Sequence, residues 1–369
     1  MACVPLQITK AEHLPPKIGV SAQAAILMDQ ESGRILYEKN IHKKMRIASI
    51  TKVMTAILAI ESGKMDEMVT VSNNAYGTEG SSIYLKKGEN ISLRNLVYGL
   101  LLRSGNDSAV AIAEKVGGSV HGFVHLMNQK AREIGMFDTH FANPHGLDDH
   151  EDHYSSAYDM ALLTKYAMNN PEFRKVFQTK FHKAPNPGEK WDRSWKNKNK
   201  LLFRYKYSTG GKTGYTKRAG RTLISTASKD DLNFIVVTLN DGGDWNDHQN
   251  LFNWGFKNYK MTSIVEKGKI TGIKQKYYDG KLYVHRDLSL PLTSEERENL
   301  KTEVTLYKPA NGERFKKRPE TAGHLDVFIN DEKETSIPLF YEKPPKDSKG
   351  FWSTFSQIFH LILGYDRHG

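Results

Sequence analysis

Apolar and polar positions alternate with two different periods along the first 260 residues of the chain. Several segments place apolar residues three or four positions apart, which is the spacing of one helix face. Shorter segments are apolar runs rich in β-branched residues, which favour strands. Helices are therefore expected at 47–60, 93–102, 108–116, 123–134 and 245–259. Strands are expected at 24–29, 34–37, 68–71, 221–227 and 233–240.

These elements predict an α+β fold in which helices pack on an antiparallel sheet. Gln30 to Gly33 is expected to form a hairpin turn, and the Lys-Asp-Asp turn at 229–231 joins the last two strands. The segment around Lys212 is expected to pair with those strands at the sheet edge. The domain closes near residue 260.

Two polar stretches of this domain give less regular patterns. The stretch from Lys180 to Lys200 is basic and rich in Trp and Asn, and we expect it to be irregular. Ser156 to Asp159 has the spacing of a capping box that opens a helix running to Tyr166. Asp159 is therefore assigned to helix capping in preference to catalysis.

The pattern changes after residue 260. Lys267 to Glu342 contains short β-like runs with turn signals at Asp279-Gly280 and Asn330-Asp331, which predicts a small all-β domain. In the tail at 350–364, one helix face would be apolar and the other polar. The apolar positions are Phe351, Trp352, Phe355, Ile358, Phe359 and Ile362. A segment this short and two-faced favours an amphipathic helix on a membrane surface, and docking onto the β domain is the alternative.

The chain is thus predicted to have four parts. They are an N-terminal segment at 1–20, the α+β domain at 21–260, the β-rich domain at 261–345 and the amphipathic helix at 350–364.

The charge and cysteine content of the chain limit the kinds of partner and metal site that can be expected. Lys and Arg outnumber Asp and Glu by 53 to 42, and the net charge of +11 suits an anionic environment such as a lipid surface or an acidic wall polymer. No arginine-rich helix or aromatic nucleic-acid motif is present, so no nucleic-acid partner is expected. The single cysteine, Cys3, excludes an internal disulfide framework and zinc sites built from several cysteines.

The first candidate for chemistry lies at the start of the apolar segment 47–60. Ser49 and Lys52 are three residues apart, which puts them on one face of a helix. A serine needs an adjacent base to become a nucleophile, and a lysine can be that base if burial and a second cation lower its pKa. Alone, a Ser-x-x-Lys spacing is also what a serine N-cap followed by a solvated lysine would give.

Two further elements make the catalytic interpretation specific. Ser104-Gly105-Asn106 separates two predicted helices, and Lys212-Thr213-Gly214 follows a glycine pair and precedes β-type sequence. Ser-x-x-Lys, a Ser-x-Asn element and Lys-Thr-Gly, in this order, form the motif set of penicillin-binding proteins and class A β-lactamases. We therefore expect an acyl-transfer site.

On these residues the chain resembles the low-molecular-mass penicillin-binding proteins that are D-alanyl-D-alanine carboxypeptidases, peptidase family S11. Within that family it is similar to the sporulation carboxypeptidases that trim spore cortex peptidoglycan. The resemblance runs from Ala24 to the C-terminus and includes the segments 46–52, 102–107, 143–149 and 210–216. It implies a β-lactamase/transpeptidase-like domain with no cofactor and no metal.

The resemblance also implies roles for the site residues. Ser49 would attack the penultimate D-Ala carbonyl of a peptidoglycan stem peptide, Lys52 would accept its proton, and Ser104 would relay a proton to the leaving group. The backbone N–H groups of Ser49 and Tyr215 would form the oxyanion hole. The remaining substrate-binding residues would be Asn106, Lys212, Thr213, Gly214, Tyr215 and Lys198. β-Lactam antibiotics would acylate the same serine.

One position departs from the family pattern. Many relatives carry arginine where Lys198 stands, and lysine lacks the bidentate fork that arginine offers a carboxylate. Carboxylate recognition at Lys198 is therefore expected to be weaker or to be supplied by other groups.

The place of action also follows from the resemblance. Such an enzyme is exported and works at the outer face of the cytoplasmic membrane or, in sporulation, at the outer forespore membrane. Residues 1–9 contain only a fragment of the apolar region of a signal peptide, so we expect Met1 to be an internal start.

Other functions compete with this interpretation. A β-lactamase shares the three elements, although no Glu-x-x-x-Asn loop precedes Lys212. A metallohydrolase would use His145, His150 and His153, but histidines of a polar loop are more often solvated and no His-Glu-x-x-His helix is present. A wall-binding protein without activity would not need the full set of site residues. Endopeptidase action on cross-links is not separated from carboxypeptidase action by sequence.

Overall fold

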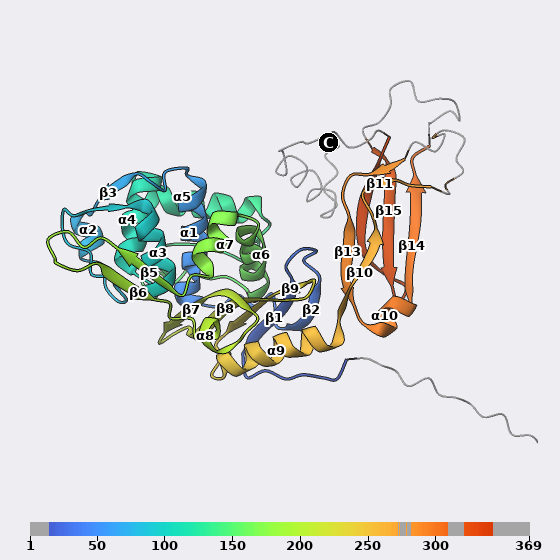
Figure 1. The fold of residues 1–369 in the computed structure, drawn as a ribbon, viewed down its shortest axis with the longest axis horizontal. Helices are drawn as coiled ribbons and strands as arrows, with labels where there is room; N and C mark the ends of the chain where they lie inside the picture. The colour runs from blue at the N-terminus through green and yellow to red at the C-terminus, as the bar shows by residue number, and fades with distance from the viewer. Residues whose placement is uncertain (1–14, 272, 274–277, 279–281, 309–320, 342–369) are drawn as a thin grey trace, which may run out of the picture. The chain divides into compact units, whose positions relative to one another are not determined.

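The computed structural model describes residues 15–271, 273, 278, 282–308 and 321–341 of the 369-residue chain. The described residues form two compact units, which we call the N-terminal unit (residues 17–257) and the C-terminal unit (from residue 258) (Figure 1).

A five-stranded antiparallel sheet forms one layer of the N-terminal unit, with the strand order β2-β1-β9-β8-β7. Its strands are β1 (Ala24–Asp29), β2 (Ile35–Lys39), β7 (Ser208–Thr216), β8 (Gly220–Lys229) and β9 (Leu232–Leu239). The predicted hairpins β1–β2 and β8–β9 are therefore confirmed, and β7 lies at the expected edge. Strand β1 is buried at every position because side chains on both faces of the sheet are covered.

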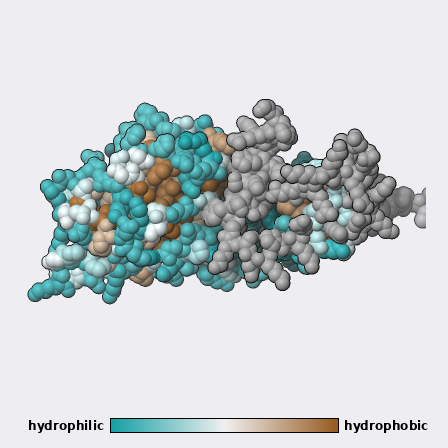
Figure 2. Space-filling view, turned by 90° about the horizontal axis from the view of Figure 1, so that it is seen from above, coloured by the Kyte–Doolittle hydropathy of each residue, from teal (hydrophilic) through white to brown (hydrophobic). Residues whose placement is uncertain are grey.

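Helices cover both faces of this sheet (Figure 1). On one face lie α1 (Lys52–Glu61), α3 (Leu93–Arg103), α4 (Asn106–Gly117), α5 (Val120–Glu133), α6 (Ala157–Met168) and α7 (Pro171–Phe177). On the other face α9 (Asp244–Asn258) packs so closely that a Cβ at Gly255 would lie 2.8 Å from Phe234 of β9. The surface seen from above is mostly hydrophilic, with one larger apolar area and several smaller ones (Figure 2).

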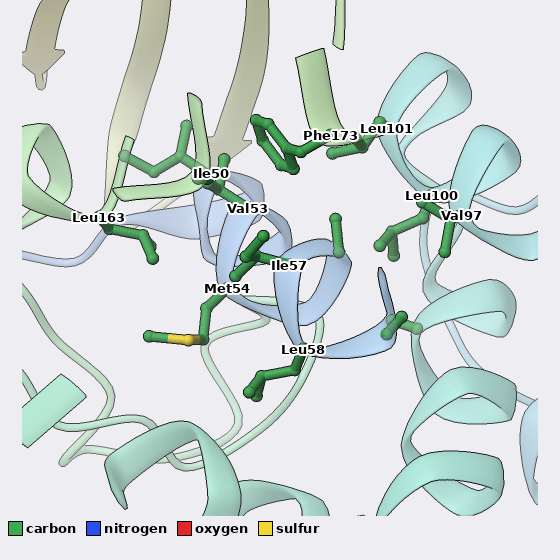
Figure 3. Close-up of a cluster of buried hydrophobic side chains, with 14 of the residues drawn as sticks. Ile50, Val53, Met54, Ile57, Leu58, Val97, Leu100, Leu101, Leu163 and Phe173 are labelled. Atoms are coloured by element: carbon green, nitrogen blue, oxygen red, sulfur yellow. The ribbon is translucent and has the colours of Figure 1, made fainter. Parts of the chain in front are cut away.

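Helix α1 is the centre of the N-terminal unit. All ten of its residues except Glu61 are buried, because α3, α6 and α7 surround it. Figure 3 shows α1 between Leu163 of α6 on one side and Leu100 of α3 on the other, with Phe173 of α7 near Val53. A helix that is apolar on all sides is stable only when it is enclosed in this way.

Short elements complete the N-terminal unit. They are the 3₁₀ turn η1 (Ala48–Thr51), the helices α2 (Asn73–Tyr76) and α8 (Leu201–Arg204), and the paired strands β3 (Met68–Thr70) and β4 (Asn90–Ser92).

The basic stretch that was expected to be irregular contains a hairpin. Strands β5 (Phe181–Ala184) and β6 (Arg193–Lys196) pair antiparallel, with Phe181 opposite Lys196. In β6 the buried residues Arg193 and Trp195 alternate with exposed polar ones. The prediction failed because a buried arginine, bonded to Glu89 at 2.8 Å, occupies a position where strand patterns have an apolar residue.

The capping-box prediction was correct for the helix start and wrong for Asp159. Ser156 does cap α6, accepting a hydrogen bond from the Asp159 backbone N–H. The Asp159 carboxylate instead accepts hydrogen bonds from the Asp138 backbone N–H (2.8 Å) and from Thr139 Oγ1 (2.6 Å). Burial raises the pKa of Asp159 to about 6, while these hydrogen bonds favour its charged form. Asp159 therefore ties the loop before α6 to that helix.

The C-terminal unit is built from strands, as predicted. Its larger sheet has the order β11-β12-β16-β15-β14. These strands are β11 (Gly268–Lys269), β12 (Tyr283–Val284), β14 (Leu300–Leu306), β15 (Thr321–Ile329) and β16 (Glu332–Phe340). A second pair is β10 (Lys260–Val265) with β13 (Leu288–Leu292), and the short helix α10 (Ser294–Glu298) follows β13. Apolar side chains from both sets, including Leu290, Val327 and Ile337, form its core.

The turn between β15 and β16 confirms one of the two turn signals. Asn330 and Asp331 have φ angles of 53° and 66°, the left-handed pair that a two-residue hairpin requires. The other signal, Asp279-Gly280, and the predicted amphipathic helix at 350–364 lie outside the described residues. Within the residues described, no helix has the length and apolar character needed to cross a membrane.

Candidate active site

Ser49 lies in the 3₁₀ turn η1, and Lys52 is the first residue of α1. The sequence predicted one continuous helix, and the structure corrects this by one turn. The correction strengthens the pairing, because side chains at i and i+3 are eclipsed in a 3₁₀ turn. Lys52 Nζ donates to Ser49 Oγ at 2.8 Å.

The backbone just before Ser49 is held in an uncommon conformation. Ala48 has a φ of +47°, a region that a residue with a Cβ adopts at a cost of roughly 1–2 kcal/mol. Thr222 Oγ1 of β8 donates to the Ile47 carbonyl at 3.0 Å. Gly146 packs against Ala48 so closely that a Cβ at Gly146 would lie 1.9 Å from the Ala48 carbonyl oxygen. Neighbouring elements therefore impose the shape of the turn.

The amine nitrogen of Lys52 is fully enclosed and lies within hydrogen-bond distance of three oxygen atoms. Besides Ser49, it donates to Asn106 Oδ1 at 2.7 Å and to the His145 carbonyl at 2.6 Å. Asn106 is the first residue of α4, and its Nδ2 donates to the Glu79 carbonyl at 2.6 Å. That second bond fixes the amide orientation, so that the oxygen of Asn106 faces Lys52.

Ser104 and Lys212 meet on the opposite side of the site. Ser104 connects α3 to α4 with a φ of +65°. Lys212 lies on β7, where its Nζ donates to Ser104 Oγ at 3.0 Å and to the Thr213 carbonyl at 2.6 Å. Segments 108 residues apart in sequence are thus joined at one point.

Both lysines are buried without a carboxylate in direct contact among the described residues. Lys52 and Lys212 are 0% and 1% exposed, and in the described part of the chain neither has a carboxylate oxygen within 4 Å. Burial, followed by the positive charges of Lys212 and Lys198, lowers the pKa of Lys52 well below its usual value. The charge of Asp107 partly opposes this lowering of the Lys52 pKa. Burial and the charge of Lys198 lower the pKa of Lys212 to about 7. The electrostatics therefore favour a neutral Lys52, as a general base requires.

Strand β7 presents the Lys-Thr-Gly segment beside the serine. Gly214 approaches the turn so closely that a Cβ there would lie 2.9 Å from Ser49 N and 2.3 Å from Thr222 Oγ1. Glycine is required at this position because any side chain would push the strand off the turn. The Tyr215 side chain is 67% exposed, and β7 is an edge strand, with one row of backbone groups open to a partner strand.

Lys198 lies at the border of the site. Its side chain is exposed, and Nζ donates to Ser81 Oγ at 3.2 Å, while its backbone N–H bonds the Leu102 carbonyl at the end of α3. Its charge contributes to the lowered pKa of both Lys52 and Lys212. The structure thus brings most of the predicted site residues together and leaves Lys198 at the border. Those brought together are Ser49, Lys52, Ser104, Asn106, Lys212 and Gly214.

The loop at 143–153 contributes a group that sequence reasoning missed. The His145 carbonyl, a backbone acceptor, binds Lys52, and the 143–149 segment gave no side-chain signal for it. The expectation that the loop histidines are solvated was correct for His150 and wrong for His145 and His153, which are 7% and 2% exposed. Burial lowers the pKa of each of these two to about 3. The described residues contain no group of His, Cys, Asp and Glu side chains arranged to hold a metal.

Comparison of the chain with known proteins identifies its family. Residues 9–243 match the family model for D-alanyl-D-alanine carboxypeptidases, and residues 259–344 match the C-terminal domain of penicillin-binding protein 5. The chain therefore belongs to the D-alanyl-D-alanine carboxypeptidase family.

Individual relatives agree with this assignment. The chain is 31% identical to the D-alanyl-D-alanine carboxypeptidase DacC of Escherichia coli, covering 96% of this chain and 92% of that protein. It is 35% identical to DacF of Bacillus subtilis, over 70% of this chain and 69% of that one. The crystal structure of penicillin-binding protein 5 from Haemophilus influenzae superposes with a TM-score of 0.76 at 28% identity, covering 89% of this chain and 98% of that one.

Proposed function

We propose that this chain removes the terminal D-Ala from peptidoglycan stem peptides through an acyl-enzyme on Ser49. The observation that supports this most directly is the 2.8 Å contact between Ser49 Oγ and the enclosed amine of Lys52. A buried lysine without a carboxylate partner is costly for stability, so its presence beside a serine favours a catalytic role.

In the proposed reaction, neutral Lys52 takes the proton from Ser49 as the oxygen attacks the penultimate D-Ala carbonyl. The backbone N–H groups of Ser49 and Tyr215 stabilise the negative charge on the carbonyl oxygen. Ser104 passes a proton to the departing D-Ala nitrogen as the C–N bond breaks, and Lys52 returns its proton to Ser104 and becomes neutral again. Loss of one oxyanion donor generally costs about 10²–10³ in rate.

Substrate binding is assigned to β7 and the groups around it. The stem peptide adds to the open edge of β7 as a further strand, which positions its backbone beside Ser49. Lys212 and Thr213 bind the terminal carboxylate, with Lys198 supplying long-range attraction from the border. Asn106 holds Lys52 and contacts the substrate amide.

A water molecule then hydrolyses the acyl-enzyme, with Lys52 and Ser104 as the groups available to activate it. β-Lactams acylate the same serine and are released slowly. This slow release would distinguish the chain from a β-lactamase, which uses the same three elements.

The cellular setting is proposed from the substrate. Peptidoglycan lies outside the cytoplasm, so the enzyme acts at the outer face of the membrane, and its net charge of +11 suits anionic surroundings. An amphipathic helix at 350–364 would hold it there. A role in spore cortex maturation is proposed from the sequence resemblance described above.

The experiment compares the parent chain with Ser49→Ala. Each is incubated with a peptide ending in D-Ala-D-Ala, and released D-alanine is measured together with labelling by a fluorescent penicillin. The expected result is release and long-lived labelling by the parent and neither by the variant. The matched control is Ser62→Ala, at the far end of α1, which keeps both.

Three results would contradict the proposal. Release by Ser49→Ala would exclude Ser49 as nucleophile. Labelling of the parent without release of D-alanine would indicate endopeptidase action or a binding role. A penicilloyl-enzyme that turns over rapidly would indicate a β-lactamase.

A further inference from the structure

Thr51 lies between the two residues of the proposed nucleophile pair and has no part in the chemistry above. Its side chain is 0% exposed. Its hydroxyl donates to the Ala48 carbonyl at 2.8 Å and lies 2.8 Å from Nε2 of His153. A buried histidine, a threonine and a backbone carbonyl thus form a chain of contacts that ends one residue before Ser49.

Only one arrangement of protons satisfies this chain. The Ala142 backbone N–H donates to Nδ1 of His153 at 3.1 Å, so that nitrogen carries no proton. Nε2 is then the protonated nitrogen and donates to Thr51 Oγ1, whose single proton goes to the Ala48 carbonyl. A protonated imidazole would put two donors face to face at Ala142. Burial and the nearby Arg46 lower the pKa of His153 to about 3, so the ring stays neutral under ordinary conditions.

The hydrogen bond from Thr51 to the Ala48 carbonyl fixes the peptide plane between Ala48 and Ser49. A trans peptide is planar, and its carbonyl and N–H point in opposite directions. Holding the Ala48 carbonyl oxygen toward Thr51 therefore aims the Ser49 N–H the opposite way. Ser49 N faces β7, since a Cβ built on Gly214 would lie 2.9 Å from it. This N–H is the group assigned above to the oxyanion hole.

Holding this peptide plane costs free energy, because the backbone of the turn is strained at Ala48. Ala48 has a φ of +47°, and it would relax toward negative φ if nothing held it. Thr222 holds the carbonyl before Ala48 from the sheet, and Thr51 holds the carbonyl after it. Removal of either hydroxyl would free one of the two peptide planes that flank Ala48.

The loop that supplies His153 also supports the base. From the same loop, the His145 carbonyl binds Lys52 at 2.6 Å, and the Pro144 carbonyl accepts from Thr55 Oγ1 of α1 at 2.6 Å. The loop therefore contacts the nucleophile turn through His153 and the base through His145.

We propose that Thr51 and neutral His153 are positioning residues that orient the Ser49 N–H toward the substrate carbonyl oxygen. They act through the Ala48–Ser49 peptide plane and do not touch substrate. The inference rests on the proposed function, since it requires Ser49 to be the nucleophile. It assigns their effect to the acylation transition state and not to binding of the ground-state peptide.

The test compares Thr51→Val with Thr51→Ser. Valine keeps the shape and loses the hydroxyl, whereas serine keeps the hydroxyl and loses the methyl group. For Thr51→Val we expect kcat for D-alanine release to fall about 10²-fold, as for a lost oxyanion donor, with KM changed less than about threefold. The acylation rate with a fluorescent penicillin should fall in parallel. Thr51→Ser should retain most of the activity.

A second pair of variants covers the case in which Thr51→Val does not fold. His153→Gln keeps an N–H donor on the side chain, and His153→Leu removes it. The glutamine variant should therefore retain clearly more kcat than the leucine variant, with melting temperatures recorded for both.

Defined outcomes overturn the proposal. They are a folded Thr51→Val with parental kcat, equal losses in Thr51→Val and Thr51→Ser, or equal losses in the two His153 variants. Ser49→Ala, assayed in parallel, separates failure of the proposed function from failure of the positioning role. Activity of that variant would remove the proposed nucleophile, whereas its inactivity beside a fully active Thr51→Val would remove the positioning role alone.

Discussion

The N-terminal unit buries two amines without a counterion as well as the paired Arg193 and Glu89, whereas the buried charge described in the C-terminal unit is paired. The N-terminal unit buries the amines of Lys52 and Lys212 beside serines and carbonyl groups, without a carboxylate in contact among the described residues. In the described part of the C-terminal unit, the buried charged side chain is Asp326, which contacts Lys333 at 2.7 Å and His324 at 3.2 Å. The second unit is thus packed for stability, whereas the first unit accepts a cost.

The difference shows how a site can be recognised from physical chemistry alone. A buried amine without a counterion is unfavourable in its charged form, so it persists only where another requirement maintains it. Two such amines close to two serines are therefore stronger evidence for chemistry than any one contact.

The largest effect that would test this comparison is expected from Lys52→Arg. A guanidinium stays protonated at all accessible pH values, so it cannot accept the proton of Ser49. We expect kcat/KM for D-alanine release to fall about 10²–10⁴-fold, the usual value of general base catalysis. The matched control is Lys301→Arg in the C-terminal unit, an exposed lysine paired with Asp331, which should change nothing. An active Lys52→Arg enzyme would show that Lys52 is not the base.

An intermediate effect is expected from Lys212→Met, with opposite signs for activity and stability. Loss of the cation should raise KM for the carboxylate-terminated peptide more than tenfold. The same change should raise the melting temperature by a few degrees, about 1 kcal/mol, since the buried amine no longer has to be desolvated. A lower melting temperature would show that the Lys212 hydrogen bonds outweigh the cost of its burial.

The pH dependence of the parent enzyme tests the same lysine. The pKa of Lys212 is lowered to about 7 in the folded chain, against 10.5 for an ordinary lysine. Between these two values the unfolded state binds more protons, so Lys212 makes stability rise as pH increases from about 7 to about 10.5. KM should increase as the pH rises through about 7, because neutral Lys212 attracts the carboxylate less. Lys212→Met should lose both trends, as followed by thermal melts and initial rates.

The smallest effect on activity is expected from Ile337→Ala in the core of the C-terminal unit. Ile337 is 1% exposed, and its truncation should cost about 2–5 kcal/mol of stability in that unit. Release of D-alanine from a short peptide should stay within about twofold, because no described site residue lies beyond residue 257. Denaturant unfolding and the peptide assay on one preparation measure both. A parallel loss of activity would show that the site depends on the second unit.

Most of the fold was predicted from the sequence. An element that buries one face has apolar residues at regular spacing, and this spacing shows whether it is a helix or a strand. The sheet order around β7 and the helices flanking Ser104 followed from runs of apolar residues. The β5–β6 hairpin did not, because its inward-facing Arg193 is charged and its counterion Glu89 lies 104 residues away. Pattern rules use neighbours in sequence and do not include such a partner.

The candidate site was predictable for side chains and not for backbone. The acyl-transfer site was predicted from the residue types and spacing of Ser49, Lys52, Ser104 and Lys212. The His145 carbonyl could not be found in this way, because every residue has a carbonyl and only the loop path selects one. The contact between His153 and Thr51 depends on a separation of 102 residues, and the polar sequence around His153 indicated exposure.

The way the site is assembled has a consequence for folding. Lys52 meets His145 across 93 residues of chain, and Ser104 meets Lys212 across 108. Contacts this distant in sequence form late and slowly, after the intervening segments have collapsed. A chain emerging from synthesis has no assembled nucleophile until β7 has joined the sheet. Onset of penicillin labelling during refolding should therefore report completion of the N-terminal unit, and not formation of its helices.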